Sequence, residues 1–333
     1  MKIAVIGGGS WGTAIARLLH KKGHEVNFFV RNDEDRKSIN EKGINEKYLP
    51  GVELAGLKAQ SDILSCVDSC EMIVMAVPTQ KFREVAQSIK DKADGKVIVN
   101  LSKGLELKTL DRVSEISAEI MPNSQFVSLS GPSHAEEVGK EIPTAIVAAS
   151  TSNNASKLVQ ETFATDTFRV YTNSDLIGVE IGGALKNIIA LAAGMSDGLG
   201  YGDNTTAALA TRGIYEMSKL GMKLGANPQT FNGLSGIGDL IVTCTSKHSR
   251  NRRAGILIGQ GLSSEEASEK VGQVVEGIKT TKSAHDLALK YGVNMPITEK
   301  LYEVLYNNKD PREAVVELMT RGYKQEIEEI FFE

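Results

Sequence analysis

The chain begins with a short apolar segment, residues 2–7, that leads directly into a glycine-rich turn. The turn has the spacing Gly-x-Gly-x-x-Gly, at Gly7, Gly9 and Gly12. A helical pattern follows over residues 13–20, and a second apolar segment over residues 25–30. Such glycines allow a tight turn, a close approach of a pyrophosphate to the backbone, and close packing of helix on strand. The pattern predicts a dinucleotide site at the start of this helix. The alternative is a tight turn in an α/β protein that binds no ligand.

The first half of the chain alternates apolar segments with helical patterns, which is typical of a doubly wound, mostly parallel sheet. Strands are expected at residues 2–7, 25–30, 71–78, 96–101, 125–130, 144–149 and 168–172. Helical patterns lie between them, for example over residues 81–90 and 109–120. Residues 72–77 are all apolar, as expected for a strand covered on both faces. The sequence therefore predicts a Rossmann-type α/β fold with ligands at the carboxyl ends of the strands.

The pattern changes near Asn173, after which the sequence shows no strand pattern. Helices are expected over residues 175–195, 205–224, 238–243, 250–259, 276–291, 295–306 and 311–320. Three prolines stand where they would start helices: Pro228, Pro296 and Pro311. We expect a dinucleotide-binding domain over residues 1–174 and an all-α, substrate-binding domain over residues 175–333. The cleft between two such domains is the expected active site.

Composition excludes several classes of partner. The 333 residues carry a net charge of −4, which offers no basic field for nucleic acid or an anionic membrane, so neither is expected as a partner. We expect no segment to span a bilayer, because none is both long enough and apolar enough by inspection of the sequence. The first expected strand starts at residue 2 and leaves no room for a signal peptide. We therefore expect a cytoplasmic protein.

The cysteines support the same compartment. They are few and odd in number, at Cys66, Cys70 and Cys244, which fits a reducing environment better than a disulfide framework. Cys66 and Cys70 would make half of a metal site, but no second cysteine or histidine pair accompanies them. Buried or surface thiols are expected instead, and no metal.

The residue after the second expected strand bears on which dinucleotide binds. NAD-preferring sites often carry an acidic residue there, which binds the ribose hydroxyls. This chain has Arg31, and a guanidinium matches a 2′-phosphate with two parallel hydrogen bonds. We therefore expect NADP to be preferred over NAD. The alternatives are that Arg31 is merely solvated, or that Asp33 reaches the ribose.

Two polar segments follow expected strands, at the edge of the sheet where ligands bind. Residues 100–106 carry Lys103, and residues 130–135 carry Gly131. The backbone N–H groups that follow Gly131 could receive a ligand oxygen. Both segments are also consistent with ordinary turns between strand and helix.

A third segment places Lys186 inside an otherwise apolar helix, between Leu185 and Ile188. Desolvation lowers a lysine pKa from about 10.4 to about 7–8 in tuned sites, which suits a proton donor beside a carbonyl. Gly182 and Gly183 precede it. Each costs roughly 1 kcal/mol in a helix interior, which indicates close approach of another backbone or of a ligand. A lysine that extends to solvent is the alternative.

A fourth segment combines an acid at a helix start, Asp239, with a run of cations beside Ser249. The cations are Lys247, Arg250, Arg252 and Arg253. An arginine fork, a serine hydroxyl and the N–H groups of a helix start fit a phosphate dianion. Each charge-assisted hydrogen bond contributes roughly 1.5–3 kcal/mol. A solvated, basic helix start is the alternative.

Seven motifs occur in order along the chain. They are Gly-Gly-Gly-Ser-Trp-Gly-Thr at 7–13, Ala-Val-Pro-Thr at 76–79, Ser-Lys-Gly-Leu-Glu at 102–106, Ser-Gly-Pro-Ser-His at 130–134, Gly-Ala-Leu-Lys-Asn at 183–187, Gly-Ile-Gly-Asp-Leu at 236–240 and His-Ser-Arg-Asn-Arg at 248–252. Their order and spacing resemble bacterial NAD(P)-dependent glycerol-3-phosphate dehydrogenases over essentially the whole chain. The resemblance implies a 6-phosphogluconate-dehydrogenase-like helical domain. It also implies reversible hydride transfer between a nicotinamide and dihydroxyacetone phosphate, making sn-glycerol 3-phosphate for phospholipid synthesis.

The resemblance also assigns roles, with Lys186 matching the catalytic acid/base. The implied substrate-binding residues are Lys103, Gly131, Ser133, Lys186, Asp239, Ser249, Arg250 and Asn251. The implied cofactor-binding residues are Gly7, Gly9, Ser10, Trp11, Gly12, Arg31, Tyr48, Lys103, Ala135, Arg250, Val274 and Glu276. Pattern alone marks Val274 and Glu276 only as a helix start. Asp239 is expected to orient Lys186 or a substrate hydroxyl.

Two other functions fit parts of the sequence. A dehydrogenase of a β-hydroxy acid would share this architecture but would bind a carboxylate in place of the phosphate. A non-catalytic dinucleotide sensor would leave Lys103, Lys186 and Arg250 unexplained. The sequence does not fix the oligomeric state, and a homodimer is possible.

Overall fold

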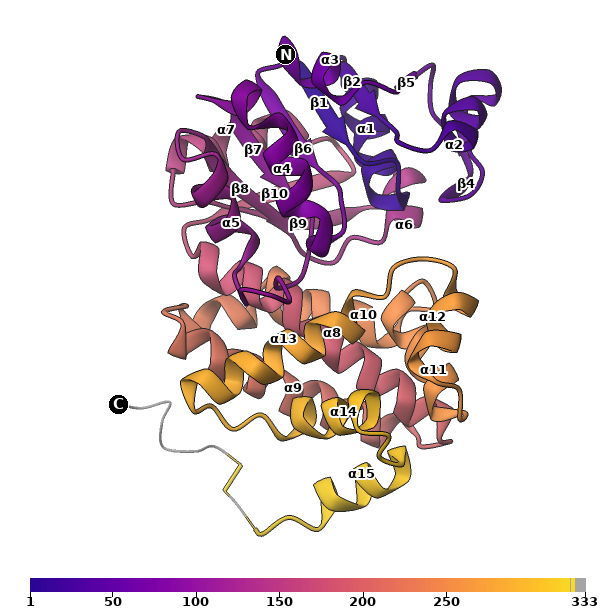
Figure 1. Cartoon of the computed structure of the whole chain (residues 1–333), viewed down its shortest axis with the longest axis vertical. Helices are drawn as coiled ribbons and strands as arrows, with labels where there is room; N and C mark the ends of the chain where they lie inside the picture. Colours follow the sequence, from indigo (N-terminus) through magenta and orange to yellow (C-terminus); the bar gives the residue numbers. More distant parts are fainter. Residues whose placement is uncertain (324, 327–333) are drawn as a thin grey trace.

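The structure is a computed structural model that describes residues 1–323 and 325–326. An α/β half that contains the N-terminus lies above a helical half in Figure 1. The last strand ends at Asn173 and the first long helix starts at Leu176, so the two halves follow one another in the sequence.

One eight-stranded sheet forms the centre of the α/β half. Its strands are β1 (Lys2–Ile6), β2 (Glu25–Phe29), β5 (Ala59–Gln60), β6 (Met72–Met75), β7 (Val97–Asn100), β8 (Gln125–Ser130), β9 (Thr144–Ala149) and β10 (Phe168–Asn173). Their order in space is β10-β9-β8-β7-β6-β1-β2-β5, and only the β8–β9 pair is antiparallel. The expected doubly wound, mostly parallel sheet is confirmed. The chain reverses direction across the sheet between β1 and β6, the place where such folds bind ligands.

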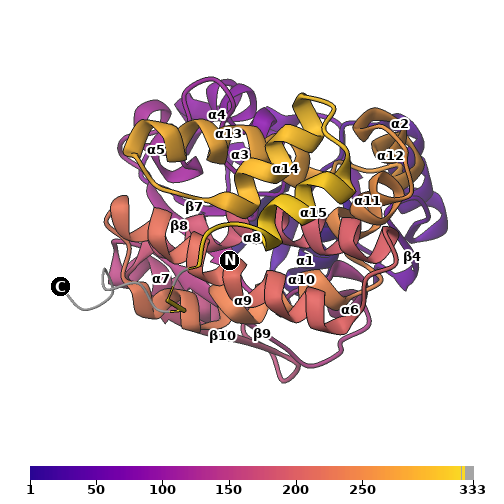
Figure 2. The same cartoon turned by 90° about the horizontal axis from the view of Figure 1, so that it is seen from below.

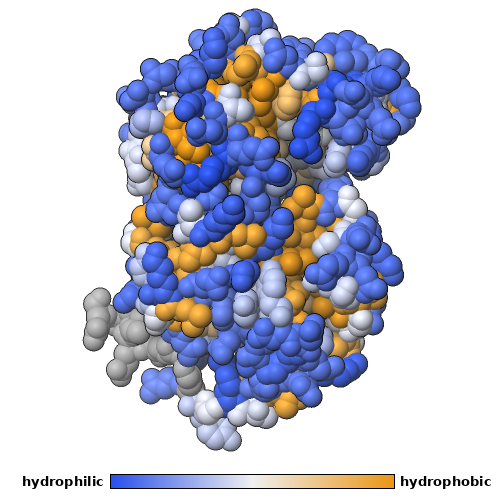
Figure 3. Space-filling view, viewed as in Figure 1, coloured by the Kyte–Doolittle hydropathy of each residue, from blue (hydrophilic) through white to orange (hydrophobic). Residues whose placement is uncertain are grey.

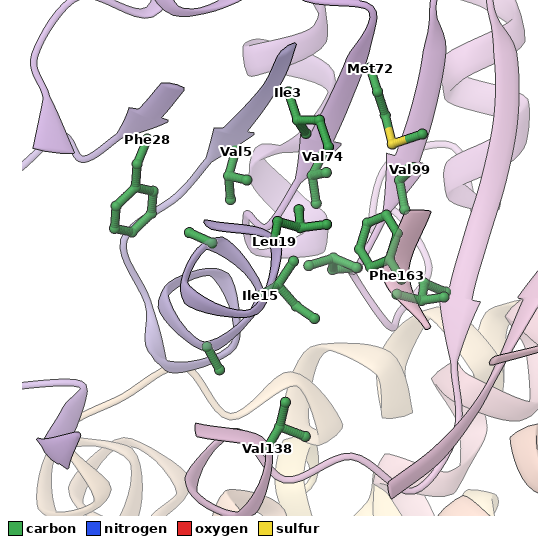
Figure 4. Close-up of a cluster of buried hydrophobic side chains, with 14 of the residues drawn as sticks. Ile3, Val5, Ile15, Leu19, Phe28, Met72, Val74, Val99, Val138 and Phe163 are labelled. Carbon is green, nitrogen blue, oxygen red and sulfur yellow. The ribbon is translucent and has the colours of Figure 1, made fainter. Parts of the chain in front are cut away.

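Helices cover both faces of this sheet. They are α1 (Ser10–Lys21), α3 (Ile63–Asp68), α4 (Thr79–Ala93), α5 (Val113–Ile120), α6 (Ala135–Gly139) and α7 (Asn153–Phe163). Alternate residues of β1 point to opposite faces: Ile3 and Val5 join the core under α1 and α7, whereas Ala4 and Ile6 join the core under α4 and α5. Figure 4 shows Leu19 of α1 against the first of these cores.

Residues 33–60 contain short elements that the sequence did not predict. They are α2 (Asp33–Lys37), the π-helical turn η1 (Ser38–Lys42), β3 (Ile44–Asn45), β4 (Leu49–Glu53) and β5. Each spans two to five residues, which is too short to show a hydrophobic period. Asn45 fixes this segment to the glycine turn, because its Nδ2 donates to the Gly8 carbonyl and to Thr13 Oγ1, at 2.9 Å each.

The described part of the second half contains helices and no strand, as expected. Its elements are α8 (Leu176–Gly198), α9 (Asp203–Lys223), the short helical turns η2 (Pro228–Asn232) and η3 (Leu234–Gly238), α10 (Asp239–Thr245), α11 (Arg250–Gly259), α12 (Ser264–Val271), α13 (Glu276–Tyr291), α14 (Pro296–Tyr306) and α15 (Pro311–Met319). Figure 2 shows them arranged around α8, which packs against α9, α10, α11 and α13.

Glycines bring α8 and α11 into backbone contact. A Cβ atom on Gly194 would lie 2.1 Å from the Arg252 carbonyl oxygen, and one on Gly255 would lie 2.2 Å from the Leu191 carbonyl oxygen. No side chain fits between the two helices at these positions. The crossing therefore fixes the start of α11 relative to the middle of α8.

One expectation about membranes needs correction. By length and composition α8 could cross a bilayer, since its mean hydropathy reaches 1.6 over 18 residues. However, 94% of that window is buried inside the protein. Burial by the surrounding helices marks α8 as a core helix.

Two expectations about helices were also wrong. The helix expected over residues 109–120 begins only at Val113, because Leu110 adopts a left-handed conformation (φ 67°) and Leu105 bridges to Arg112. Helix α12 was not predicted. Its sequence did carry signals, since Ser263 and Glu266 form a capping box and Gly272 ends the helix at φ 69°.

Candidate active site

The glycine turn leaves an open helix N-terminus at the carboxyl end of β1. A Cβ atom on Gly12 would lie 2.0 Å from the Gly7 carbonyl oxygen, so only glycine permits this packing. Gly9 faces open space: apart from its chain neighbours, no atom of the described residues lies within 4 Å of its Cβ position. Helix α1 has no side-chain cap and no acidic residue in its first turn. Its free N–H groups and the positive end of its dipole therefore fit a pyrophosphate.

The segment before α13 reaches from the helical half to this turn. Gln273 Oε1 accepts a hydrogen bond from Ser10 Oγ at 3.5 Å. Glu276, the first residue of α13, accepts the Thr79 N–H on Oε1 at 3.0 Å. Its other carboxylate oxygen is buried without a partner, and burial raises the pKa of this carboxyl. An orphaned buried acceptor fits a ligand that brings a donor.

Trp11 and Tyr48 flank the glycine turn. Trp11 lies in the first turn of α1 and packs on Phe168, with ring centroids 6.4 Å apart. Its Nε1 is buried without a partner. The Tyr48 N–H donates to Asn45 Oδ1 at 3.3 Å, and Asn45 is the residue that holds the turn. Both predicted cofactor residues are therefore anchored close to the helix start.

The end of β2 presents two arginines. Arg31 is exposed. Arg36 donates from Nη1 to the carbonyl oxygens of Val30 and Arg31, at 2.8 Å each, and Nη2 pairs with Asp33. Because Asp33 is already engaged by a cation, it is a poor candidate for the ribose hydroxyls.

Two lysine side chains, one from the α/β half and one from the helical half, donate to the same carboxylate. Lys103 follows β7, Lys186 lies in the middle of α8, and Asp239 starts α10. Asp239 Oδ2 accepts from Lys103 Nζ at 2.6 Å, and Oδ1 accepts from Lys186 Nζ. Lys186 and Asp239 are only 6% and 1% exposed. Asp239 therefore holds both lysines at the boundary between the halves.

Burial controls the protonation of this group. It lowers the pKa of Lys186 to about 7, because desolvation of the ammonium outweighs the attraction of Asp239. Burial alone would raise the pKa of Asp239, but the charges of Lys103 and Lys186 outweigh it and lower that pKa. A lysine that titrates near neutrality can both give and accept a proton.

The loop after β8 reaches the same group. The Gly131 carbonyl oxygen accepts from Lys103 Nζ at 3.0 Å and from Ser133 Oγ at 2.8 Å. Gly131 has a φ of 142°, a conformation that favours glycine. Ala135 is buried at the start of α6. Ser133 and Lys103 therefore donate to the same carbonyl oxygen.

The two glycines before Lys186 make room for neighbouring chain segments. A Cβ atom on Gly183 would lie 2.8 Å from Ser130 Oγ, and one on Gly182 would lie 2.6 Å from the Ser235 carbonyl oxygen. The close approach that the sequence suggested for these glycines is present. It brings the end of β8 against α8.

The N-terminus of α11 lies beside the two lysines. Asn251 Nδ2 donates to Oδ1 of Asn187, the neighbour of Lys186, at 2.9 Å, and Asn251 Oδ1 accepts the Gly277 N–H. Ser249 caps α11 by accepting the Arg252 N–H at 3.2 Å. These bonds fix the helix start relative to α8.

Arg250, the first residue of α11, is exposed. Its guanidinium makes no hydrogen bond or salt bridge within residues 1–323 and 325–326. Surrounding protein lowers the pKa of its guanidinium, against the attraction of Glu276 and Glu136. The sequence predicted that four cations bind the phosphate. This prediction is wrong for Arg252, which pairs with Asp197 of α8 at 2.7 Å. Val274 is exposed in the segment before α13.

Most of the chain matches one family of known proteins. Residues 2–156 match the NAD-dependent glycerol-3-phosphate dehydrogenase N-terminus, and residues 175–316 match the corresponding C-terminus. The chain belongs to the NAD-dependent glycerol-3-phosphate dehydrogenase family. The resemblance seen in the sequence is thereby confirmed.

Relatives share both the sequence and the fold of this family. The glycerol-3-phosphate dehydrogenase [NAD(P)+] of Desulfitobacterium hafniense is 51% identical over 99% of this chain and 94% of its own length. That of Geobacillus kaustophilus is 54% identical over 98% of this chain and 97% of its own. The crystal structure of the Coxiella burnetii glycerol-3-phosphate dehydrogenase has a TM-score of 0.92 at 39% identity, covering 96% of this chain and 98% of that one.

Three residues to which the sequence analysis gave no role support the candidate site of this glycerol-3-phosphate dehydrogenase family member. Thr243 Oγ1 bonds Lys186 Nζ at 2.9 Å. Asn187 Nδ2 donates to the Lys103 carbonyl oxygen at 3.2 Å and so ties β7 to α8. Glu180 accepts from Arg112 and Ser114 and so ties α5 to α8. Of these three, only Glu180 could have been identified from the sequence, because a carboxylate in an otherwise apolar helix is unusual.

Proposed function

We propose that this chain catalyses the reversible reduction of dihydroxyacetone phosphate to sn-glycerol 3-phosphate, with NAD(P)H as reductant. The observation that carries the proposal is the single carboxylate, Asp239, that holds Lys103 and Lys186 beside the start of α11. This arrangement combines an acid that can protonate a ketone oxygen with a cationic helix start that can bind a phosphate.

The start of α11 is the proposed phosphate site. Arg250 is free to form a two-pronged contact, and the capped helix start adds a positive dipole end. Ser249 and Asn251 complete the proposed site, and Asn251 acts mainly by holding α11 against α8. Positioning the ketone in this way offsets several kcal/mol of the barrier, on the order of 7–11 kcal/mol in well-oriented systems.

Lys186 is the proposed proton donor. Bound NADPH supplies the hydride that adds to C2 of the ketone. Lys186, held by Asp239 and Thr243, gives its Nζ proton to the C2 oxygen. Lys103 stabilises the developing negative charge on that oxygen. In the reverse direction neutral Lys186 removes the proton from the hydroxyl of glycerol 3-phosphate.

We propose that the α/β half holds the dinucleotide. Its pyrophosphate would lie on Gly9 and Ser10, at the open start of α1. Trp11, Tyr48 and Ala135 are proposed as further contacts there, and Val274 and Glu276 as contacts from the helical half. Exposed Arg31, together with Asp33 already bound by Arg36, favours NADP over NAD.

The compartment and assembly belong to the same proposal. The three cysteines are free and buried, and burial raises the pKa of Cys66 to about 11, as suits unreactive thiols. We propose a cytoplasmic enzyme that supplies the phospholipid precursor. We also propose a homodimer, which light scattering would test.

A spectrophotometric assay tests the proposed activity. NADPH oxidation at 340 nm is expected with dihydroxyacetone phosphate and much less with dihydroxyacetone, since only the former engages Arg250. Equal turnover of the two ketones, or turnover of a β-hydroxy acid alone, would reject the proposal. Stoichiometric NADPH binding without turnover of any ketone would favour the sensor.

A further inference from the structure

The segment that carries Lys103 runs from the sheet into the helical half. It begins after β7, and just beyond Lys103 it reaches Leu105, which is fully buried in the hydrophobic core of the helical half. Figure 1 shows the chain between β7 and α5 reaching down to the helices. Figure 3 shows hydrophobic residues among hydrophilic ones on the surface where the two halves meet. The place of the Lys103 amine therefore depends on a segment that both halves must hold.

The backbone up to Lys103 is held by hydrogen bonds from both halves. Ser102 Oγ donates to the Val77 carbonyl oxygen at 2.6 Å, and the Ser102 N–H donates to Asn100 Oδ1 at 2.9 Å. Asn187 of α8 donates from Nδ2 to the Lys103 carbonyl oxygen at 3.2 Å. These bonds end at Lys103 itself, so the position of the chain beyond it depends on other contacts.

Gln80, in the first turn of α4, holds the chain beyond Lys103. Its Nε2 donates to the Leu105 carbonyl oxygen at 2.8 Å, and its Oε1 accepts the Leu107 N–H at 3.0 Å. Because one end of the amide faces a carbonyl and the other faces an N–H, these partners fix its orientation. One side chain thereby holds residues 105–107 against α4. Gln80 directly follows the Ala-Val-Pro-Thr motif at 76–79 and has no role in the proposed function.

Close packing transmits this hold to Lys103. A Cβ atom on Gly104, the residue after Lys103, would lie 2.7 Å from Thr79 Oγ1, so the chain lies directly on the first residue of α4. Glu106 pairs with Arg83, one turn further along α4, at 2.9 Å. The chain that follows Lys103 is therefore fixed to α4 over several successive residues.

The amine of Lys103 contacts groups from both halves. It donates to the Gly131 carbonyl oxygen at 3.0 Å and to Asp239 Oδ2 at 2.6 Å. Lys186 donates to the other oxygen of the same carboxylate. A change in the place of Lys103 thus changes the charge that Lys186 faces.

We propose that Gln80 is a positioning residue for proton transfer. By holding residues 105–107 on α4, it keeps the Lys103 amine on Asp239 and so sets the charge beside Lys186. In this role Gln80 contacts neither substrate nor cofactor. The role rests on the proposed function, which gives Lys103 and Lys186 their parts in the reaction.

Two substitutions of Gln80 remove its hold in different ways. Gln80→Met keeps the length of the side chain and removes both hydrogen bonds. Gln80→Glu keeps an acceptor for the Leu107 N–H but loses the donor to the Leu105 carbonyl oxygen. Each is expected to lower kcat for dihydroxyacetone phosphate on the order of tenfold, because a displaced Lys103 stabilises the developing charge less well. If thermal denaturation shows that Gln80→Met does not fold, Gln80→Glu still tests the role.

A double-mutant cycle shows whether Gln80 acts through Lys103. Lys103→Met alone is expected to lower kcat. Adding Gln80→Met to it is expected to change kcat by no more than about twofold, since no amine is left to position. A merely structural role would lower kcat by the same factor in both backgrounds, and equal factors would overturn the proposal.

The titration of Lys186 gives a readout that does not need turnover. Burial is the main cause of its lowered pKa, and the charge of Lys103 lowers that pKa further. In ¹⁵N-lysine spectra of the full-length protein, the Lys186 midpoint is therefore expected to rise by about 0.5–1 pH unit in both Gln80 variants. Three other titratable groups interact electrostatically with Lys186, and all lie outside the segment that Gln80 holds: Asp239, Cys244 and His134. If wild-type protein fails to reduce dihydroxyacetone phosphate, the proposed function fails, and this midpoint still decides whether Gln80 places Lys103.

A glutamine outside the site serves as a matched control. Gln160 of α7 is likewise partly buried and donates from Nε2 to a backbone carbonyl oxygen, that of Val170, at 2.7 Å. Strand β10, which carries Val170, is separated from β7 by two strands. Gln160→Met is expected to lower thermal stability but to change neither kcat nor the Lys186 midpoint. Wild-type kcat and a wild-type midpoint in both Gln80 variants would overturn the proposal.

Discussion

The two halves of the molecule use glycine for opposite purposes. Gly9 in the α/β half faces open space: apart from its chain neighbours, no atom of the described residues lies within 4 Å of its Cβ position. Gly194 and Gly255 in the helical half face carbonyl oxygens at 2.1 and 2.2 Å. Glycine leaves room for a ligand in the first half and lets two helices touch in the second. The same residue type therefore indicates a binding surface in one half and a packing surface in the other.

The halves also differ in how their polar groups are engaged. The start of α1 has no side-chain cap, so its N–H groups are free for a ligand. In the helical half, Lys186 is bonded to Asp239 and Thr243, and Asn187 to Asn251. The α/β half thus leaves open the helix start proposed to bind a dinucleotide, whereas the helical half already holds the proposed reacting groups in place.

Removal of the Lys186 amine is expected to have the largest effect on activity. Lys186→Met should lower kcat for dihydroxyacetone phosphate by about 10²–10⁴-fold, because the C2 oxygen loses its proton donor. NADPH affinity, measured by fluorescence titration, should be unchanged, since Lys186 is not among the proposed cofactor contacts. Lys90→Met, on the exposed face of α4, is the control. Retained turnover would mean that another group donates the proton.

Arg250→Ala should weaken substrate binding at the proposed phosphate site of the helical half. Loss of about 1.5–3 kcal/mol per charge-assisted hydrogen bond raises the KM for dihydroxyacetone phosphate roughly 10–100-fold. Turnover of unphosphorylated dihydroxyacetone should be unaffected, which steady-state kinetics with both ketones would reveal. Lys290→Ala, exposed at the far end of α13, is the control. An equal loss with both ketones would place the phosphate elsewhere.

A pair of alanine substitutions tests the contrast between the glycines. Gly255→Ala should lower the free energy of unfolding by about 1–3 kcal/mol, because a methyl group is forced against the Leu191 carbonyl oxygen. Gly9→Ala should leave the unfolding free energy nearly unchanged but raise the KM for NADPH. Urea denaturation and steady-state kinetics measure the two effects. If both variants lose stability alike, the contrast fails.

The pH dependence should follow Lys186. Reduction needs the ammonium form, so kcat for reduction should fall as pH rises through about 7, the pKa of Lys186, by about tenfold per unit beyond it. Oxidation of glycerol 3-phosphate needs the neutral amine and should rise through the same pH. Profiles of kcat in both directions measure this. Parallel profiles in the two directions would exclude Lys186 as the titrating group.

The smallest effect is expected at the exposed edge of the α/β half. Arg31→Asp should raise the KM for NADPH by about tenfold and leave that for NADH nearly unchanged, because only the former loses a phosphate contact. Lys223→Asp, exposed at the end of α9 in the helical half, is the control. Equal effects on both cofactors would refute the predicted NADP preference.

Much of the α/β half could be read from the sequence, because its signals are local. Residues 72–77 are all apolar and form the buried strand β6. The glycine spacing likewise marks the open start of α1 within six residues. The short elements between residues 33 and 60 escaped prediction, because a strand of two residues has no period to detect.

The helical half was less readable, because its site depends on contacts between distant segments. Lys186 and Asp239 stood out individually as a charge in an apolar helix and an acid at a helix start. That Asp239 would bind Lys103 and Lys186 together was not predicted, since the three residues span 136 positions of the chain. Arg252 shows the converse. It adjoins the proposed phosphate-binding residues in the sequence, but in the structure its side chain pairs with Asp197.

The sequence by itself determined the order of the elements, the dinucleotide turn and the family, because each depends on residues that are close together or on a fixed order of motifs. Tertiary structure alone decided which amines share a carboxylate, which arginine pairs with Asp197, and that α8 is a core helix. Those outcomes depend on burial and on the packing of distant segments. Neither property is encoded in any short stretch of the chain.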